Sequence, residues 1–200
     1  MKTTTALTMI LTVTVAASMA PGAEVGKPAP AFTLKDVQGT SHSLAGFKGK
    51  TVVLEWTNYD CPFVKKHYGT KNMQMLQKKY TGKDVIWLSI CSSAEGKQGH
   101  YAPEAWQKKI KEQGSHATAV LLDADGKVGR KYGAKTTPHL FVVGPDGTLK
   151  YAGAIDDNPS WNPKTVKGAR NYVAEAVDAV LAGKNVPVAE TKSYGCSVKY

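Results

Sequence analysis

The sequence predicts an α/β protein with a mixed central sheet and helices on both of its faces. Short runs rich in β-branched and aromatic residues alternate with longer stretches of helical periodicity. In the last third, two strands joined by a Gly-Pro-Asp-Gly turn predict a hairpin, and one more helix follows. The order β-α-β-α-β-β-α therefore predicts parallel and antiparallel strands in one sheet. The composition, with 42% hydrophobic and 21% charged residues, is that of a globular domain.

The first half of the domain supplies a hairpin, a strand and an interrupted helix. Residues 31–34 and the glycine-containing turn after them predict an N-terminal hairpin extension. Residues 51–57 read TVVLEWT, a β-branched and aromatic run that predicts a short strand. From Pro62 onward apolar residues recur at helical spacing, and Gly69 and Asn72 predict a kink or break in that helix.

The second half continues the alternation of strands and helices. A nearly all-apolar run over 84–90 predicts a buried strand, and Pro103 and Gly114 bound the next helix. The remaining expected elements are a strand at 119–122, the hairpin strands at 140–143 and 148–152, a core-facing helix at 168–181 and an irregular tail.

The first twenty residues predict a secretory signal peptide that does not belong to the fold. Lys2 is the one charged residue in 1–20, and an apolar run over 6–17 follows it. This run is shorter than the roughly 20 residues that span a bilayer, so an integral membrane protein is not expected; an uncleaved leader is the alternative. We expect a periplasmic or secreted protein with a folded domain over 26–183 and a tail over 184–200.

Positive charge is spread along the chain without forming a block. Lysine and arginine total 26 against 16 acidic residues, a net charge of +10, and no basic run exceeds two residues. No arginine-rich arm or zinc-finger spacing accompanies this charge. We therefore expect a solvated basic surface and no nucleic-acid partner.

Cys61 is the residue with the clearest chemical signal. It follows the strand at 51–57 and immediately precedes Pro62, and proline is favoured in the first turn of a helix. Free N–H groups and the helix dipole at such an end lower a thiol pKa from about 8.5 toward 3.5–7.5. Lys65 and Lys66 favour the same anionic form. Cys61 is therefore predicted to be a nucleophile, with an inert buried cysteine as the alternative.

Three motifs in this order resemble the thioredoxin superfamily, closest to its redoxin, or peroxiredoxin-like (AhpC/TSA-like), branch. They are EWTNYDCPFVKK at 55–66, TTPH at 136–139 and DGTLxYxG at 146–153. The resemblance covers residues 26–181 and implies a thioredoxin-like fold. It also implies thiol–disulfide exchange through Cys61. We expect neither a cofactor nor a metal site.

The resemblance further implies a substrate groove opposite Cys61. In this superfamily the bond corresponding to Thr137–Pro138 is a cis peptide whose backbone groups bind an extended substrate chain. The alternative is an ordinary trans proline at the start of the next strand. Trp56 and Phe63 are expected to wall this groove, although aromatic residues at such places also belong to cores and rims.

Two departures from the parent patterns leave the second half of the reaction open. A thioredoxin carries another cysteine three positions after the first, where this chain has Val64. The peroxiredoxin pattern P-x-x-x-T-x-x-C is also unmatched, since Leu54 and Asn58 take the proline and threonine positions relative to Cys61. Neither parent mechanism can therefore be carried over whole.

The possible resolving thiols are Cys91, Cys196 or a thiol from outside the chain. Cys91 immediately follows the strand at 84–90, and ends of neighbouring parallel strands meet at one sheet edge. Cys196 lies in the tail, expected to be mobile and able to fold back. Three cysteines cannot all pair within one chain, so at least one is free or paired elsewhere.

Glu55 is a candidate acid or base. It interrupts an apolar strand six residues before Cys61, about where the resemblance implies a buried carboxylate that assists proton transfer. A carboxyl group in that setting has a raised pKa and can exchange protons with a leaving thiol. A solvated or lysine-paired carboxylate is the alternative.

The sequence as a whole predicts an exported thiol oxidoreductase whose partner is a protein or small-molecule thiol or disulfide. A peroxiredoxin-like thiol peroxidase and a non-catalytic peptide-binding module are the alternatives. A Cu(I) carrier has less support, because Lys65 stands where a C-x-x-x-C pair needs its second cysteine. The ligands of such a carrier would come from His67, His139, Cys61 and Cys91.

Overall fold

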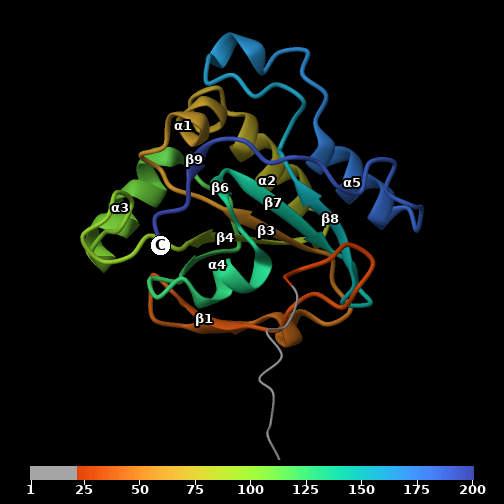
Figure 1. Ribbon diagram of the computed structural model, residues 1–200, viewed down its shortest axis with the longest axis horizontal. Helices are drawn as coiled ribbons and strands as arrows, with labels where there is room; N and C mark the ends of the chain where they lie inside the picture. The colour runs from red at the N-terminus through yellow and green to blue at the C-terminus, as the bar shows by residue number, and fades with distance from the viewer. Residues whose placement is uncertain (1–21) are drawn as a thin grey trace, which may run out of the picture.

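The computed structural model describes residues 22–200, so the expected signal peptide lies outside the described residues. A seven-stranded sheet in the order β2-β1-β5-β4-β3-β7-β8 runs through the centre of the molecule (Figure 1). The strands are β1 (Thr33–Asp36), β2 (Ser41–Ser43), β3 (Val52–Trp56), β4 (Ile86–Cys91), β5 (Ala119–Leu122), β7 (His139–Val143) and β8 (Leu149–Gly153).

The pairing of these strands makes the sheet mixed, as the sequence predicts. Strand β3 runs parallel to β4 and antiparallel to β7, and β4 runs parallel to β5. The N-terminal hairpin of β1 and β2 forms as predicted and joins the sheet through antiparallel pairing of β1 with β5. The hairpin of β7 and β8 closes the other edge.

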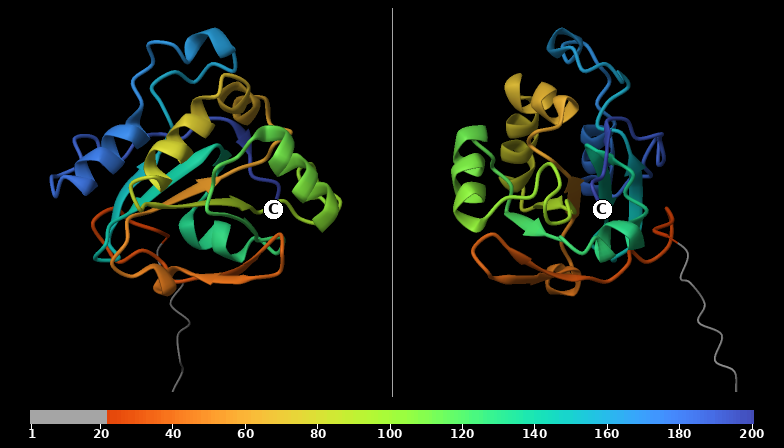
Figure 2. Two further views of the ribbon diagram at one scale, coloured as in Figure 1. Left: turned by 180° about the vertical axis from the view of Figure 1, so that it is seen from behind. Right: turned by 60° about the vertical axis from the view of Figure 1, so that its left-hand side comes forward.

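Helices cover both faces of the sheet (Figure 2). Helices α1, α2, α3 and α5 pack on one face in a core that includes Val53, Trp87 and Tyr151, while α4 and the N-terminal segment cover the other face around Leu54. Adjacent residues of β3 thus enter opposite cores, which follows from the two-residue period of a strand. The helices are α1 (Pro62–Gly69), α2 (Asn72–Thr81), α3 (Pro103–Gln113), α4 (Lys127–Tyr132) and α5 (Tyr172–Leu181).

The predicted interruption after Pro62 is confirmed and separates α1 from α2. Lys71 adopts a left-handed conformation with a φ of 63°, so the chain turns between Gly69 and Asn72 and starts a second helix. The short helix α4 was not predicted. The Asp123 carboxylate accepts hydrogen bonds from the backbone N–H groups of Val128 and Gly129, which stabilises that six-residue helix at its start.

The connection from β8 to α5 forms an arm that projects above α1 in Figure 1. Helix α5 begins at Tyr172, later than the predicted residue 168, because the Asn171 side chain caps it by accepting from the N–H of Ala174. Trp161 lies within the arm and is 67% exposed.

The tail is more ordered than the sequence predicts. Residues 189–200, here called the strap, cross the molecule from β8 toward α4 (Figure 1). Within the strap, β9 (Cys196–Ser197) pairs antiparallel with β6 (Thr136–Thr137). At its end, the Tyr200 ring lies against Gly129, where an added Cβ would approach the Tyr200 hydroxyl to 2.5 Å. The expectation of a mobile tail around Cys196 is therefore wrong, because backbone pairing and this packing hold the strap in place.

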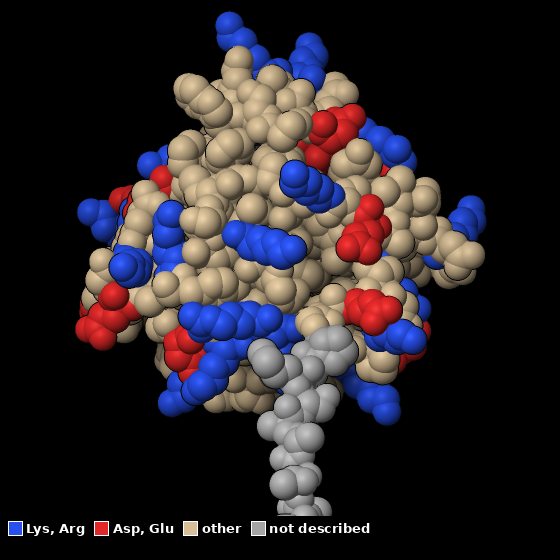
Figure 3. Space-filling view, viewed as in Figure 1, with Lys and Arg blue, Asp and Glu red and all other residues tan. Residues whose placement is uncertain are grey.

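Residues 22–200 contain no helix with the length and apolar character needed to cross a bilayer. Lysine and arginine side chains are scattered over the face shown in Figure 3, with acidic side chains among them. This distribution agrees with the dispersed positive charge expected from the sequence.

Candidate active site

Cys61 occupies the N-terminal end of α1, as its position before Pro62 predicts. It is the N-cap residue, and its carbonyl accepts the helical hydrogen bond from the Lys65 N–H at 2.9 Å. Its side chain is fully buried. The Sγ atom lies 3.1 Å from the carbonyl oxygen of Thr137 and 2.8 Å from the Sγ of Cys196.

The strap brings Cys196 to this sulfur. Cys196 is the register partner of Thr137 in the β6–β9 ladder, and Thr137 in turn contacts Cys61. Gly195 permits the close approach, because a Cβ built on it would lie 2.1 Å from the Thr137 carbonyl oxygen. Its φ of 135° is also a conformation that favours glycine. All three cysteines of the chain are free thiols.

The two sulfurs of this pair have unlike acidities. Burial by itself raises the pKa of Cys61, but hydrogen bonds from the Cys196 side chain and the Val64 N–H help to bring it below the ordinary value. Burial and the neighbouring Cys61 raise the pKa of Cys196 to about 11. Cys61 is therefore the more acidic member of the pair, and when Cys61 is ionised the Cys196 thiol is the donor in the hydrogen bond between them.

The bond between Thr137 and Pro138 is a cis peptide. Thr137 is buried, and its hydroxyl has no hydrogen-bond partner within the described part of the chain. The backbone on this side of Cys61 already pairs with the strap. At the place where the sequence predicts a groove, the structure therefore has β9 of the strap paired with β6.

Cys91 is near the same sheet edge but is not joined to the pair. It ends β4, the parallel neighbour of β3, as predicted. Its buried Sγ lies 3.4 Å from the carbonyl oxygen of Gly99, and burial raises its pKa. Of the two resolving candidates within the chain, the structure brings Cys196 and not Cys91 into contact with Cys61.

Glu55 is fully buried, so the solvated or lysine-paired alternative is wrong. It projects from β3 toward α1 and α2 and accepts hydrogen bonds from four side chains: Tyr68, Gln77, Trp87 and Ser89. Burial raises its pKa, and these bonds only partly oppose that rise. The contacts of its carboxyl group tie β3 and β4 to the helices, and none of its hydrogen bonds reaches Cys61.

The two aromatic residues expected in the groove, Trp56 and Phe63, lie on opposite faces of the sheet. Trp56 does not line the groove: the ring is fully buried on the opposite face of the sheet, 5.2 Å from the ring of Phe141, and Nε1 donates to the Ser92 hydroxyl. Strand alternation sends Trp56 to the face away from α1, which explains the correction. Phe63 is half-buried in the first turn of α1, 5.9 Å from the ring of Tyr194 in the strap.

The lysines after Cys61 also differ from each other. Lys65 is exposed, whereas Lys66 is buried and donates to the carbonyl oxygen of Asn158 at 2.8 Å. The Lys66 ammonium lies 3.7 Å from the Asp156 carboxylate. Lys66 therefore pairs with the loop after β8 and does not serve as a counter-ion for Cys61. Sequence reasoning missed Asp156 and Tyr194 here, because neither lies in a motif.

Both arginines of the chain are engaged away from Cys61. Arg130 donates to the Asp125 carbonyl and stacks 4.5 Å from the ring of Tyr200, while Arg170 forms a two-bond pair with Glu175. These contacts leave the thiolate to be stabilised by the helix end and by Cys196.

Residues 22–200 contain no cluster of three or more His, Cys, Asp and Glu side chains placed to hold a metal ion. His139 packs on Phe141 with ring centroids 4.4 Å apart, and its Nδ1 accepts from the Lys135 N–H. Burial lowers its pKa to about 4, so the ring is neutral near neutral pH.

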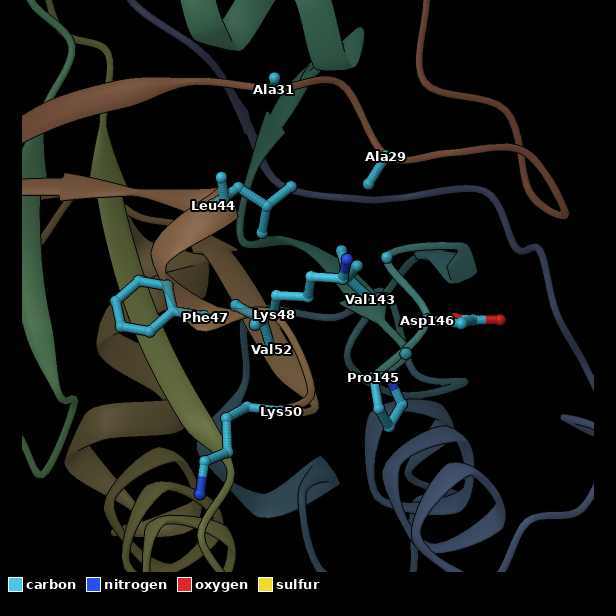
Figure 4. A pocket seen from close by; sticks show the side chains of 13 residues that line it. Ala29, Ala31, Leu44, Phe47, Lys48, Lys50, Val52, Val143, Pro145 and Asp146 are labelled. Atoms are coloured by element: carbon cyan, nitrogen blue, oxygen red, sulfur yellow. The ribbon is translucent and has the colours of Figure 1, made fainter.

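A mostly apolar pocket of about 250 Å³ lies at the other end of the sheet (Figure 4). It is lined by Val52 at the start of β3 and Val143 at the end of β7, with Leu44 and Phe47 beside them. Cys61 follows the opposite end of β3, so this pocket is separate from the paired sulfurs.

Comparison with known proteins places the site in a redox context. The sequence model of the AhpC/TSA family matches residues 25–152. The thiol-disulfide oxidoreductase ResA of Bacillus thuringiensis is 27% identical over 126 residues, 63% of this chain and 67% of that protein. The thiol:disulfide interchange protein DsbE of Escherichia coli is 26% identical over 157 residues, 76% of this chain and 77% of that protein.

Solved structures confirm the expected thioredoxin-like fold. An uncharacterised conserved protein from Geobacillus kaustophilus superposes with a TM-score of 0.75 at 28% identity, over 92% of this chain and 94% of that one. The thioredoxin domain of a thiol-disulfide oxidoreductase from Bacteroides vulgatus gives 0.52 at 25% identity, over 72% of this chain and 96% of that one.

Proposed function

This chain belongs to the AhpC/TSA family, and from that membership and its paired sulfurs we propose that it is a thiol–disulfide oxidoreductase. Cys61 is the nucleophile and Cys196 the resolving cysteine. The observation that carries this proposal is the 2.8 Å contact between the two Sγ atoms. The relatives named as thiol–disulfide oxidoreductases and interchange proteins support the same reaction class.

The proposed reaction has two exchange steps. In the first, the Cys61 thiolate attacks one sulfur of a substrate disulfide, forming a mixed disulfide and releasing the other substrate sulfur as a thiolate. In the second, Cys196 loses its proton and attacks the Cys61 Sγ, which forms the Cys61–Cys196 disulfide and releases the second substrate thiol. The substrate gains two electrons and two protons, and a dithiol from outside the chain returns the protein to its reduced form.

The acidities of the two thiols fit these roles. The thiol with the lowered pKa attacks first, because exchange proceeds through the thiolate. Cys196, with its pKa raised to about 11, stays protonated while Cys61 is anionic. Once Cys61 is consumed in a mixed disulfide, its negative charge is gone, and one cause of the raised Cys196 pKa disappears with it.

Substrate access requires displacement of the strap. Cys61 is fully buried, and β9 occupies the backbone of β6 beside it. Cavities of about 750 and 560 Å³ lie along Thr191–Ser193 of the strap. We propose that a substrate chain enters where β9 lies, facing Thr137, Pro138 and Phe63.

The redox partner is proposed to be a protein or small-molecule thiol or disulfide met after export. Support for export comes from the leader-like composition of residues 1–20. An oxidising compartment would regenerate the Cys61–Cys196 disulfide, whereas a dedicated reductant would keep both thiols reduced.

A thiol peroxidase is the second candidate function, and the burial of Cys61 beneath the strap favours it. A hydroperoxide is small enough to reach a covered sulfur with less movement of the strap than a protein needs. The Cys61 thiolate would take one peroxide oxygen and become a sulfenic acid, releasing an alcohol or water. The Cys196 thiol would then displace water and form the same disulfide.

Mapping of disulfides after a single turnover tests the proposal. Reduced protein is mixed with one equivalent of an aryl disulfide, quenched with acid and examined by mass spectrometry. Wild type is expected to end with the Cys61–Cys196 disulfide, Cys196→Ser to stop with the aryl thiol on Cys61, and Cys61→Ser to remain unmodified.

Cys91→Ser is the matched control and should behave as wild type. Preferential modification of Cys196 or Cys91 would refute Cys61 as nucleophile. Rapid formation of the same disulfide with micromolar hydroperoxide would favour the peroxidase. Full biological activity of Cys61→Ser would instead support a binding module.

A further inference from the structure

A buried polar cluster joins the strap to both helices that follow Cys61. We call it the Tyr194 cluster; its members are Lys66 and His67 of α1, Asn72 of α2, Asp156 of the loop after β8, and Tyr194 of the strap. The first two side chains have 0% exposure and Asp156 has 2%. Tyr194 precedes Cys196 by two residues. The cluster thus connects the segments that carry the two reactive sulfurs.

The direction of each hydrogen bond in the cluster is fixed by its chemistry. Burial lowers the pKa of His67 to about 3, so the ring is neutral and carries one proton. The Asn72 amide nitrogen lies 2.9 Å from Nδ1 and donates to it, which places the proton on Nε2. Nε2 lies 3.2 Å from the Tyr194 oxygen and donates to it. The Tyr194 hydroxyl is then free to donate to the Asp156 carboxylate.

Among the members of the Tyr194 cluster, Tyr194 is the one that comes from the strap. Its hydroxyl accepts from His67 and, at 3.5 Å, from the Lys66 ammonium, and it donates to a loop carboxylate, so both of its hydrogen-bonding functions are used inside the cluster. The Asp156 carboxylate also receives the Asn158 N–H and lies near the Lys66 ammonium. A hydrogen bond to such a buried charged group contributes more than one between neutral partners.

We propose that Tyr194 is a positioning residue for the resolving step: its hydroxyl, held between His67 and Asp156, keeps Cys196 against Cys61. The proposal rests on the proposed function, since it assigns Cys196 the resolving role. The Tyr194 hydroxyl reaches neither sulfur, and its effect passes through the backbone of Gly195 to Cys196. Cys61 is the N-cap of α1, and His67 lies on the same helix. The contact between the Tyr194 hydroxyl and His67 therefore fixes the position of the strap relative to the nucleophile.

The measurable consequence is the effective concentration of Cys196 at Cys61. A docked strap holds the two thiols together before they are oxidised, which favours their disulfide. Without the hydroxyl, the docked strap leaves the His67 N–H without its acceptor and removes one of the two donors to Asp156 Oδ1, the other being the Asn158 N–H. The detached strap makes neither contact, so its free energy is unaffected by the substitution. The reduced strap then spends more time detached, and the disulfide forms less readily.

The experiment equilibrates Tyr194→Phe and wild type with defined ratios of reduced and oxidised glutathione. Acid quenching and mass spectrometry then give the fraction with the Cys61–Cys196 disulfide. We expect the effective concentration in Tyr194→Phe to be at least about tenfold lower than in wild type, as suits a hydrogen bond to a buried charge. Asp156→Asn, which keeps the shape of the acceptor without its charge, should move the value in the same direction.

Tyr132→Phe is the matched control, because its hydroxyl donates to the Pro30 carbonyl at 2.7 Å outside the strap. This control loses the hydrogen bond of a phenol that is more buried than Tyr194, and it should keep the effective concentration within about twofold of wild type. Circular dichroism and urea titration show that each variant is folded at the temperature used.

The outcomes separate this inference from the proposed function. A wild-type protein that forms no Cys61–Cys196 disulfide at any glutathione ratio removes the proposed function. A wild type that forms it, with Tyr194→Phe unchanged within twofold, overturns the positioning role alone. Equal losses in Tyr194→Phe and Tyr132→Phe also overturn it, because they would reflect general loosening of the fold.

Discussion

Thr137 and Cys196 are register partners between β6 and β9, although they stand 59 positions apart in the sequence. Through this pairing the Cys196 sulfur comes within 2.8 Å of Cys61, and the strap covers the helix end. The site is therefore assembled from a local motif and a distant segment. Substitutions around Cys61 and substitutions in the strap are therefore expected to have different effects.

The acidity of Cys61 should depend on the thiol that faces it. Contact with Cys196 is one cause that lowers the Cys61 pKa, so removal of that donor raises the pKa. We expect the Cys61 pKa to be lowest in wild type and highest in Cys196→Ala, which has no donor at this position. In Cys196→Ser the hydroxyl still donates, so the Cys61 pKa should stay close to that of wild type. The alkylation rate of Cys61 followed against pH gives each value. A pKa in Cys196→Ala at or below that of wild type would contradict the hydrogen bond.

Gly195→Ala should detach the strap and expose Cys61. The added methyl group would lie 2.1 Å from the Thr137 carbonyl oxygen, so the β6–β9 ladder has to open. Overpacking of this kind costs about 1–3 kcal/mol, or roughly 5- to 150-fold in the docking equilibrium. Alkylation of Cys61 by a neutral reagent should accelerate accordingly.

Gly183→Ala is the control for this substitution. Gly183 also has a positive φ, 66°, but an added Cβ there meets nothing within 4 Å. It should lose some stability through backbone strain and leave Cys61 as protected as in wild type. Equal acceleration in both variants would show that the Thr137 contact does not hold the strap.

Glu55→Gln should remove a pH dependence of stability. The folded pKa of Glu55 is raised above its ordinary 4.5 by burial. As pH rises from about 4.5 toward the folded value, the unfolded chain releases the proton and the folded chain retains it, so the free energy of unfolding decreases. The advantage of wild type over Glu55→Gln is therefore greatest at acid pH and shrinks above it.

Urea titrations of both proteins between mildly acid and neutral pH measure this difference. A gap between wild type and Glu55→Gln that grows as pH rises would mean that the folded pKa lies below 4.5. The glutamine retains one oxygen acceptor for Trp87 and Ser89, so the comparison isolates the proton.

Lys66→Met should destabilise the fold far more than Lys65→Met. Lys66 is buried beside Asp156, and removal of one partner of a buried pair costs about 3–5 kcal/mol because the other charge stays unpaired. Lys65 is exposed, and its replacement should change the free energy of unfolding by no more than about 0.5 kcal/mol. Urea titration of both variants checks the contrast, and similar values would rule out the buried pair as a stabilising contact.

Local signals were enough to predict the helix end at Cys61. A strand, a cysteine and a proline follow one another there, and each acts on its immediate neighbours. The parallel course of β3 and β4, and hence the common sheet edge of Cys61 and Cys91, also followed from the alternation of elements. These features depend on residues close together in the sequence.

The choice between Cys91 and Cys196 could not be predicted, because it depends on the path of the tail. The strap has no periodic pattern, and its only strand, β9, has two residues. Helix α4 escaped prediction for a similar reason, since it is six residues long and contains Gly129, which has low helix propensity. Trp56 was misplaced because sequence position gives closeness along the chain but not the face of the sheet.

The buried position of Cys91 makes its thiol a natural probe of opening around the end of β4. The side chain is 3% exposed and contacts the Gly99 carbonyl, so a labelling reagent reaches it only when the chain around it opens. In protein whose other two cysteines are joined, Cys91 is the single remaining thiol. The rate at which Cys91 is labelled then measures how often this region opens, with no probe engineered into the chain.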